Sequence, residues 1–214
     1  MRISGSRSGS QSLADRRPGR LRSANRRFGR SGACSNRRDQ RSLFERQDEL
    51  SRRLADALRQ CSVLHTDDIA WHHGVFSWDE LLINNVLPVV RDRRALNYRP
   101  PAWFARGRDG AITLDGDRDF VIIEGVRASQ ASMRAQLDVS IWVETPQSVR
   151  DSRDAARLAA GEMSATSYAN WMAEENAYVA AELPWQHADL IVDGSGSLDH
   201  DQETEIAFRV AQSG

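Results

Sequence analysis

The sequence predicts an α/β fold in which a parallel sheet is flanked by helices on both faces. Three short segments, residues 119–125, 140–144 and 188–194, are apolar and rich in β-branched side chains, as expected for strands covered on both faces. Helical patterns separate these segments, and strands that alternate with helices typically form parallel sheets. The 214 residues are enough for one such domain and too few for several independent cores.

The charge distribution divides the chain near residue 50. Residues 1–49 carry 13 arginines and 5 acidic side chains, whereas residues 50–214 carry 16 arginines and 25 acidic side chains. We therefore expect two parts: an Arg-, Ser- and Gly-rich segment, residues 1–49, that is disordered or mistranslated, and an α/β domain over residues 50–214. The acidic balance of the second part argues against a broad nucleic-acid interface.

Cysteine usage and hydropathy predict a reduced, cytoplasmic protein that makes no membrane contact. The sequence has only Cys34 and Cys61, which have no metal-ligand spacing and are too few for a disulfide scaffold. No stretch approaches the roughly 18 apolar residues of a membrane span. The N-terminus lacks the apolar core of a secretory signal.

The remaining elements of the second part follow from local patterns. Residues 50–60 are amphipathic and predict a helix. The apolar run that follows predicts a buried strand ending near His65. Further helices are predicted from Trp78 to about Arg91 and at residues 130–137, 146–160 and 164–182. A last segment, residues 203–210, is compatible with an edge strand.

Three carboxylates fall at predicted strand ends. Ligands of open α/β sheets bind at the carboxyl ends of the strands, and Asp67, Asp68 and Glu124 lie there. A carboxylate in such a place can accept the proton of a substrate hydroxyl, contact substrate or bind magnesium through water. The structural alternatives are that the aspartates cap a following turn or helix and that Glu124 bonds to a neighbouring loop.

Three arginines and two aromatic residues are further candidates. Arg150, Arg153 and Arg157 are spaced three and four apart, so one helix face presents three guanidiniums that could clamp phosphate. An ordinary salt-bridged surface helix gives the same pattern. Tyr98 and Trp103 could stack a nucleobase, although aromatic clusters are more often part of a core.

The order of these segments resembles the uridine kinase branch of the P-loop NTPases, a nucleoside kinase superfamily. HTDDIAW is similar to the family's aspartate segment, NYRPPAW to the segment that packs on the nucleoside, and FVIIEGV to the Glu-Gly strand. SIWVE and the arginines after it are similar to the strand and lid helix, and ADLIVDG to the closing strand. The resemblance covers about residues 50–194.

The resemblance implies a kinase-like three-layer sandwich with a substrate-side insert at residues 96–118 and lid-like helices at residues 146–182. It implies ATP-dependent phosphoryl transfer, with Mg2+, to a nucleoside such as uridine or cytidine or to a similar small alcohol. Nucleic acid is not an expected partner. By this resemblance Asp67 is the base, Asp68 its neighbour and Glu124 the metal and substrate contact. By the same resemblance, the three arginines are expected to bind the ATP phosphates. Tyr98 and Trp103 are expected to bind the nucleoside.

The phosphate-binding loop of that family is missing. The family needs GxxxxGK[ST] directly before the first helix, because the loop's backbone N–H groups and lysine hold the phosphates. The sequence contains no lysine, and the nearest glycine-containing string, residues 29–35, lies too far upstream. We therefore expect weak or absent ATP binding and impaired catalysis.

A shift of reading frame accounts for the missing loop. With Arg, Ser and Leu written as CGN, TCN and CTN, the codons of residues 41–48 read one nucleotide later give GNT, CNC, TNT, TYG, ARC, GNC, ARG and AYG. These triplets permit Gly-Arg-Ser-Ser-Ser-Gly-Lys-Thr, and residues 37–40 in the same frame permit Val-Ala-Ile followed by Asn or Ser. Our hypothesis is that residues 1–49 are a frame-shifted first strand and loop.

The alternative for residues 1–49 is a genuine basic arm. In that case the chain would be a non-catalytic, kinase-like binding protein whose arm contacts nucleic acid or a partner through its arginines. Arginine and serine richness is also typical of an organelle transit peptide.

Overall fold

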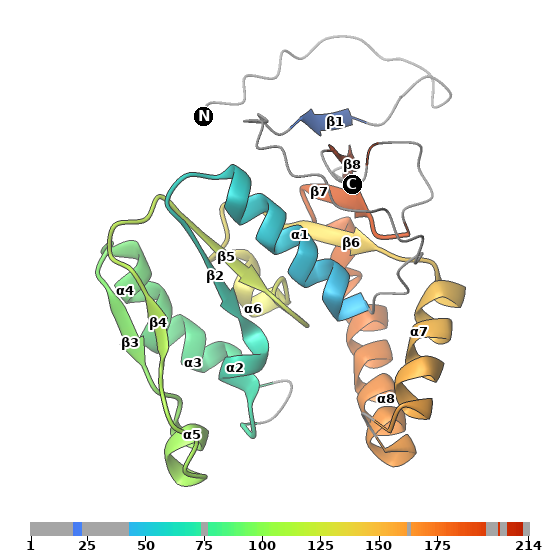
Figure 1. Ribbon diagram of the computed structural model, residues 1–214, viewed down its shortest axis with the longest axis horizontal. Helices are drawn as coiled ribbons and strands as arrows, with labels where there is room; N and C mark the ends of the chain where they lie inside the picture. The colour runs from blue at the N-terminus through green and yellow to red at the C-terminus, as the bar shows by residue number, and fades with distance from the viewer. Residues whose placement is uncertain are drawn as a thin grey trace, which may run out of the picture.

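The computed structural model describes residues 19–22, 43–73, 77–161, 164–195, 201 and 205–211, without the side chains of residues 19–22, 43–48 and 153. Parallel strands with intervening helices make it an α/β fold, as predicted (Figure 1).

The first half of the domain opens with a helix, a strand and a second helix in direct succession. These are α1 (Leu43–Ala57), β2 (Cys61–His65) and α2 (Thr66–Ala70). The predicted helix and the strand end at His65 are confirmed. The helix starts at Leu43 instead of residue 50, because residues 43–49 include Leu, Glu, Arg and Gln, which favour helix.

A helical stretch from Asp79 to Arg91 follows in this half of the domain, as predicted. It consists of α3 (Asp79–Leu81), the π-helical turn η1 (Leu82–Val86) and α4 (Leu87–Arg91). Pro88 stands at the start of α4. Since proline has no N–H to donate to the preceding turn, the helical hydrogen-bond pattern changes there, which explains the π turn.

The segment after α4 contains a small hairpin that the sequence patterns did not indicate. It comprises β3 (Leu96–Tyr98), α5 (Pro101–Ala105) and β4 (Ile112–Leu114), with β3 and β4 antiparallel. Strands of three residues are too short for an alternation signal. Their buried anchors, Leu96, Ile112 and Leu114, attach the hairpin to the core.

Four strands predicted from apolar runs are present. β5 (Phe120–Glu124) pairs parallel with β2, and β6 (Ile141–Glu144) pairs parallel with β7 (Leu190–Asp193). The helices between them are α6 (Ala131–Arg134), α7 (Gln147–Ala159), α8 (Ala165–Glu182) and the 3-10 turn η2 (Pro184–Gln186). β8 (Glu205–Val210) and β1 (Gly19–Arg22) extend the second sheet antiparallel.

Among the described strands, the parallel strands form two separate pairs. β2 and β5 make one sheet, and β6 belongs to the other, in the order β1-β8-β7-β6. β8 lies between β7 and β1, so it is a strand as expected but not an edge strand.

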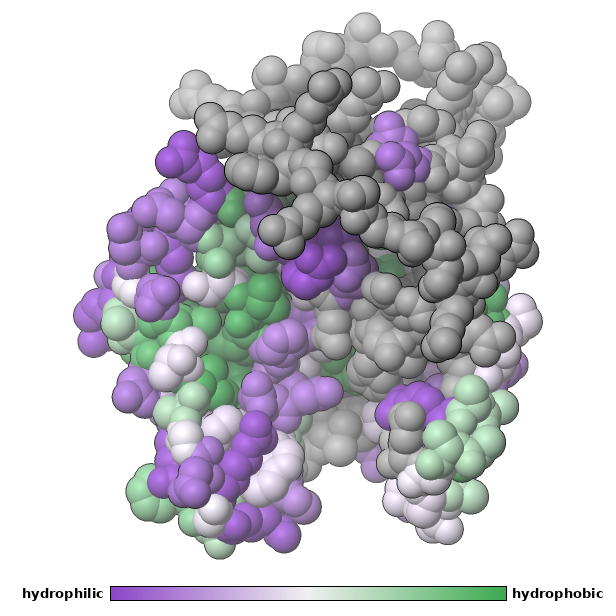
Figure 2. Space-filling view, viewed as in Figure 1, coloured by the Kyte–Doolittle hydropathy of each residue, from purple (hydrophilic) through white to green (hydrophobic). Residues whose placement is uncertain are grey.

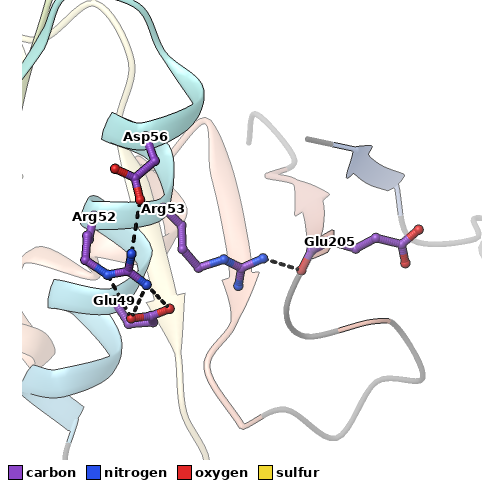
Figure 3. Close-up of polar contacts among 5 residues, drawn as sticks. All are labelled: Glu49, Arg52, Arg53, Asp56 and Glu205. Carbon is purple, nitrogen blue, oxygen red and sulfur yellow. Dashed lines mark hydrogen bonds and ion pairs between the residues drawn. The ribbon is translucent and has the colours of Figure 1, made fainter. Parts of the chain in front are cut away.

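Helix α1 connects the two sheets. It packs on β2 and β5, and the Arg53 guanidinium donates a 2.9 Å hydrogen bond to the backbone oxygen of Glu205 in β8 (Figure 3). On the same helix Arg52 forms ion pairs with Glu49 and Asp56, one turn away in each direction. Leu54 and Leu58 of the helix line a cavity of about 930 Å³ that residues of β5 and β6 also line.

The main core lies between the β2–β5 pair and the helices that follow it. Its members are fully buried apolar side chains, chiefly Leu64, Ile69, Trp78, Leu82 and Met133. Of the helices that the structure describes, none has the length and apolar character needed to cross a bilayer.

The turn between α1 and β2 gives a first prediction. Gln60 has φ +52°, a conformation in which a Cβ atom costs about 1 kcal/mol. Both Gln60→Gly and Gln60→Ala lose the side-chain hydrogen bond to Asp117, but only glycine relieves the backbone strain. We expect the glycine variant to be the more stable of the two by about 1 kcal/mol in urea unfolding. Equal stabilities would contradict the assigned turn.

Candidate functional site

The candidate site lies at the carboxyl ends of β2 and β5. His65 and Glu124 end these strands and are partners in the parallel register. The His65 Nδ1 atom lies 2.7 Å from Oε2 of Glu124, whose side chain is only 9% exposed. The pair joins the two strand ends and fixes the direction of the Glu124 carboxylate.

Gly125 and Thr66 lie in close contact just after the ends of β5 and β2. Gly125 has φ +130°, and a Cβ atom there would lie 2.0 Å from Oγ1 of Thr66. Thr66 is fully buried at the start of α2. Glycine is therefore required after Glu124, both for the backbone conformation and for the space.

Both predicted aspartates lie in the first turn of α2. Asp68 is half-buried, and its Oδ1 accepts a 2.7 Å bond from the Arg108 guanidinium. Its backbone oxygen accepts a 2.8 Å hydrogen bond from the indole N–H of Trp103. Asp67 is exposed. Acidic residues in a first turn also interact favourably with the helix dipole, so the structural alternative has support as well.

The aromatic candidates are placed against the core. Trp103 is 4% exposed, and the Arg108 guanidinium lies 3.6 Å from its ring centroid. Tyr98, in β3, packs against the same core, and burial raises the pKa of its hydroxyl. Stacking of a base on either ring stays a prediction. Arg108 already covers one face of Trp103.

The predicted arginine clamp lies on α7, which follows β6. Arg150 is half-buried and bonds to the Gln147 side chain, and Arg157 is half-buried on the same helix. The Arg153 side chain lies outside the described residues. The arginines thus follow the end of β6, whereas the candidate carboxylates lie at the ends of β2 and β5.

Several residues that interact at these strand ends were not identified by the sequence patterns. His65 and Arg108 hold two of the predicted carboxylates. Arg127, after β5, lies 4.6 Å from the ring centroid of Tyr178, and burial lowers the pKa of its guanidinium. The Gly after Glu124 was the one local signal, since a glycine directly after a strand indicates a close approach.

Glu175 of α8 is a half-buried carboxylate with one fully buried oxygen, and it lines the same cavity as residues of β5 and β6. Burial raises the pKa of Glu175, and the positive charges of Arg127 and Arg150 oppose that shift. Burial also raises the pKa of Tyr178 on the same helix to about 12. The two arginines that follow β5 and β6 thus act on one carboxylate.

The described residues do not fit a magnesium-triphosphate group. No three His, Cys, Asp or Glu side chains among them come together to hold a metal ion, and Asp68 and Glu124 already have cationic or imidazole partners. The glycine string at residues 29–35 lies outside the described residues. No step below is therefore assigned to the metal.

Comparison with known proteins gives a weak likeness to a solved structure. No family model and no curated protein matches the chain. Among solved structures it is similar to a possible uridine kinase from Bacillus stearothermophilus, with 20% identity over 68% of this chain and 78% of that chain, and a TM-score of 0.42. A likeness of this size assigns no activity.

The contact between Gly125 and Thr66 gives a second prediction. Gly125→Ala should lower the unfolding temperature clearly more than Gly110→Ala, since a Cβ at Gly110 meets nothing within 4 Å while both glycines have positive φ. The comparison separates the clash from backbone strain. Equal losses in a thermal melt would show that the two strand ends are not in close contact.

Glu175 gives a third prediction. Its folded-state pKa is raised above the ordinary 4.5, so the protonated carboxyl stabilises the fold, and this contribution is lost as pH rises through the folded-state pKa. Glu175→Gln should therefore gain stability relative to the unchanged chain as pH rises above 4.5, the ordinary pKa of a glutamate, in urea unfolding. Glu174→Gln, at an exposed neighbour, should show no such divergence. A pH-independent difference would contradict the burial of Glu175.

Proposed function

We propose that this chain is an ATP-dependent phosphotransferase for a nucleoside or similar small alcohol, impaired because its sequence lacks a phosphate-binding loop. The observation that carries the proposal is the meeting of two carboxylate-bearing strand ends. The turn with Asp67 and Asp68 follows β2, and Glu124 ends β5 opposite His65 in the same register. This is the edge of a parallel sheet at which ligands bind.

The two aspartates have different surroundings, which suggests different roles. Asp68 is tied to Arg108 and Trp103, so it fixes the turn against the hairpin. Asp67 is exposed one residue earlier and is the better candidate to orient the acceptor hydroxyl and take its proton. Glu124, oriented by His65, would contact the acceptor.

The acceptor would lie near the hairpin. The lower edge of the face in Figure 2 is hollowed between the hairpin side and helices α7 and α8. Arg108 and the aromatic rings of Trp71 and Trp103 border the strand end of β2. Aromatic and guanidinium groups suit a nucleoside. Helix α7, with Arg150, Arg153 and Arg157, would supply the lid.

The missing phosphate-binding loop, which would hold the phosphate donor ATP, explains why we expect impaired catalysis. Phosphoryl transfer depends almost entirely on positioning and on charge stabilisation at the phosphates. Without GxxxxGK[ST], the backbone cradle and its lysine are missing, and such contacts contribute several kcal/mol. We therefore expect residues 1–214 to bind ATP weakly or not at all.

The alternative, a non-catalytic protein with a nucleic-acid-binding arm, depends on residues 1–49. Only residues 19–22 and 43–49 of that part are described, so this alternative stays a prediction. It requires salt-dependent DNA binding that is lost on deletion of residues 1–49.

Restoring the loop tests the proposal. Residues 1–49 are replaced by an apolar strand followed by Gly-Arg-Ser-Ser-Ser-Gly-Lys-Thr, and phosphate transfer from ATP to a panel of nucleosides is measured. We expect turnover that falls by about 10²- to 10⁴-fold with Asp67→Asn, because the base is lost. Asp115→Asn, at an exposed position after β4, is the matched control.

Two outcomes would contradict the proposal. One is a folded chimera that binds ATP but phosphorylates none of the alcohols. The other is an equal loss of activity from Asp67→Asn and Asp115→Asn. Full activity of the unchanged chain would instead overturn the account of its defect.

A further inference from the structure

Arg108, between α5 and β4, reaches back to the helix that follows β2 (Figure 1). Its guanidinium donates a 2.7 Å hydrogen bond to Oδ1 of Asp68, in the first turn of α2. The Arg108 Cζ atom lies 3.6 Å from the ring centroid of Trp103 in α5 and 5.1 Å from that of Trp71, the residue that follows α2. One side chain of the hairpin thus contacts both ends of α2.

The backbone of Arg108 is held on both sides. Its N–H donates a 3.0 Å hydrogen bond to the oxygen of Trp103, and the N–H of Gly107 donates to the oxygen of Phe104. Gly107 has φ +65°, so the end of α5 has the bonds and the left-handed glycine of a Schellman cap. The Arg108 oxygen accepts a 2.6 Å bond from the Arg99 guanidinium. The Arg108 side chain therefore extends from a backbone that the hairpin fixes.

The hairpin binds Asp68 at two of its atoms. Arg108 bonds to the carboxylate, and the indole N–H of Trp103 donates a 2.8 Å hydrogen bond to the backbone oxygen. Trp103 is buried, so packing fixes the position of its ring. Bonds to the side chain and to the backbone of one residue fix its orientation. Since Asp67 precedes Asp68 in the same turn, the hairpin also sets the direction of the Cα–Cβ bond of Asp67.

Stability alone is a weak reason for this arrangement. The side chains of Arg108 and Asp68 are 32% and 38% exposed, and ion pairs as exposed as this contribute little to the free energy of unfolding. Geometry is a stronger reason. A planar guanidinium can lie on an indole ring and donate to a carboxylate at the same time, whereas the ammonium of lysine is a point charge without that plane.

We propose that Arg108 is a positioning residue for phosphoryl transfer, which orients Asp67 by holding Asp68 and the first turn of α2 against the hairpin. The inference rests on the proposed function, in which Asp67 takes the proton of the acceptor hydroxyl. It adds a residue of the hairpin to the machinery of that step. Arg108 acts through the turn of α2 and not by contact with the acceptor.

Kinetics of the chimera with the restored phosphate-binding loop test the inference. The kcat and the acceptor KM are measured for the nucleoside with the highest turnover. We expect Arg108→Met to lower kcat by about tenfold or more and to change KM less than about twofold, because orientation is lost while binding is kept. Arg108→Lys should restore part of kcat, since it keeps the charge beside Asp68. Arg106→Met, at an exposed position of the same hairpin, is the matched control and should change neither value.

A double variant shows whether Arg108 acts through Asp67. In a chimera that already carries Asp67→Asn, Arg108→Met should cause no further loss of kcat, because residues that act as one unit have non-additive effects. The same loss as in the unchanged background would mean that Arg108 acts independently of the base, and it would overturn the inference.

Hydrogen exchange in the full chain of 214 residues separates this inference from the proposed function. Arg108→Met should speed exchange in peptides spanning residues 66–73 by about fivefold or more, and Arg106→Met should not. If Arg108→Met does not fold, Arg108→Lys is compared with Arg106→Met in the same measurements.

The outcomes are distinguishable. An active chimera that tolerates Arg108→Met, a raised acceptor KM with unchanged kcat, or unaltered exchange over residues 66–73 overturns the inference and leaves the proposed function standing. A folded chimera that binds ATP but phosphorylates none of the alcohols contradicts the proposed function, and the positioning role with it.

Discussion

The parallel pairing of β2 with β5 is the constraint on which the candidate site depends. Its register places His65 opposite Glu124, and one residue later Thr66 fills the space that a side chain at Gly125 would need. A slip of one residue would turn Glu124 away from His65 and bring a Cβ against the start of α2. The position of Asp67 follows from the same pairing, since α2 starts where β2 ends.

Much of the architecture could be predicted because the strands are short, apolar and separated by helical patterns. The β5 and β7 segments are apolar on both faces, and α8 was bounded correctly to within a residue. The hairpin of β3 and β4 could not be predicted, because three residues give no alternation. The π turn before Pro88 could not be predicted either, because it depends on the single backbone N–H that proline lacks.

The site was predictable only in part, for a physical reason. Strand ends identified Asp67, Asp68 and Glu124, because the carboxyl edge of a parallel sheet is a general property of the fold. Their partners, His65 and Arg108, come from another strand and from the hairpin, and such pairings depend on register and on a turn geometry that local sequence does not encode. Whether the three carboxylates serve catalysis is still a prediction.

The tryptophan pair at the wall of the cavity has a practical consequence. Trp142 of β6 and Trp185 of η2 approach each other beside the space that faces β5. Indole emission moves to shorter wavelength when water leaves its surroundings. The protein thus carries an intrinsic fluorophore at this wall, so that its spectrum would register the arrival of any apolar segment there without a chemical label.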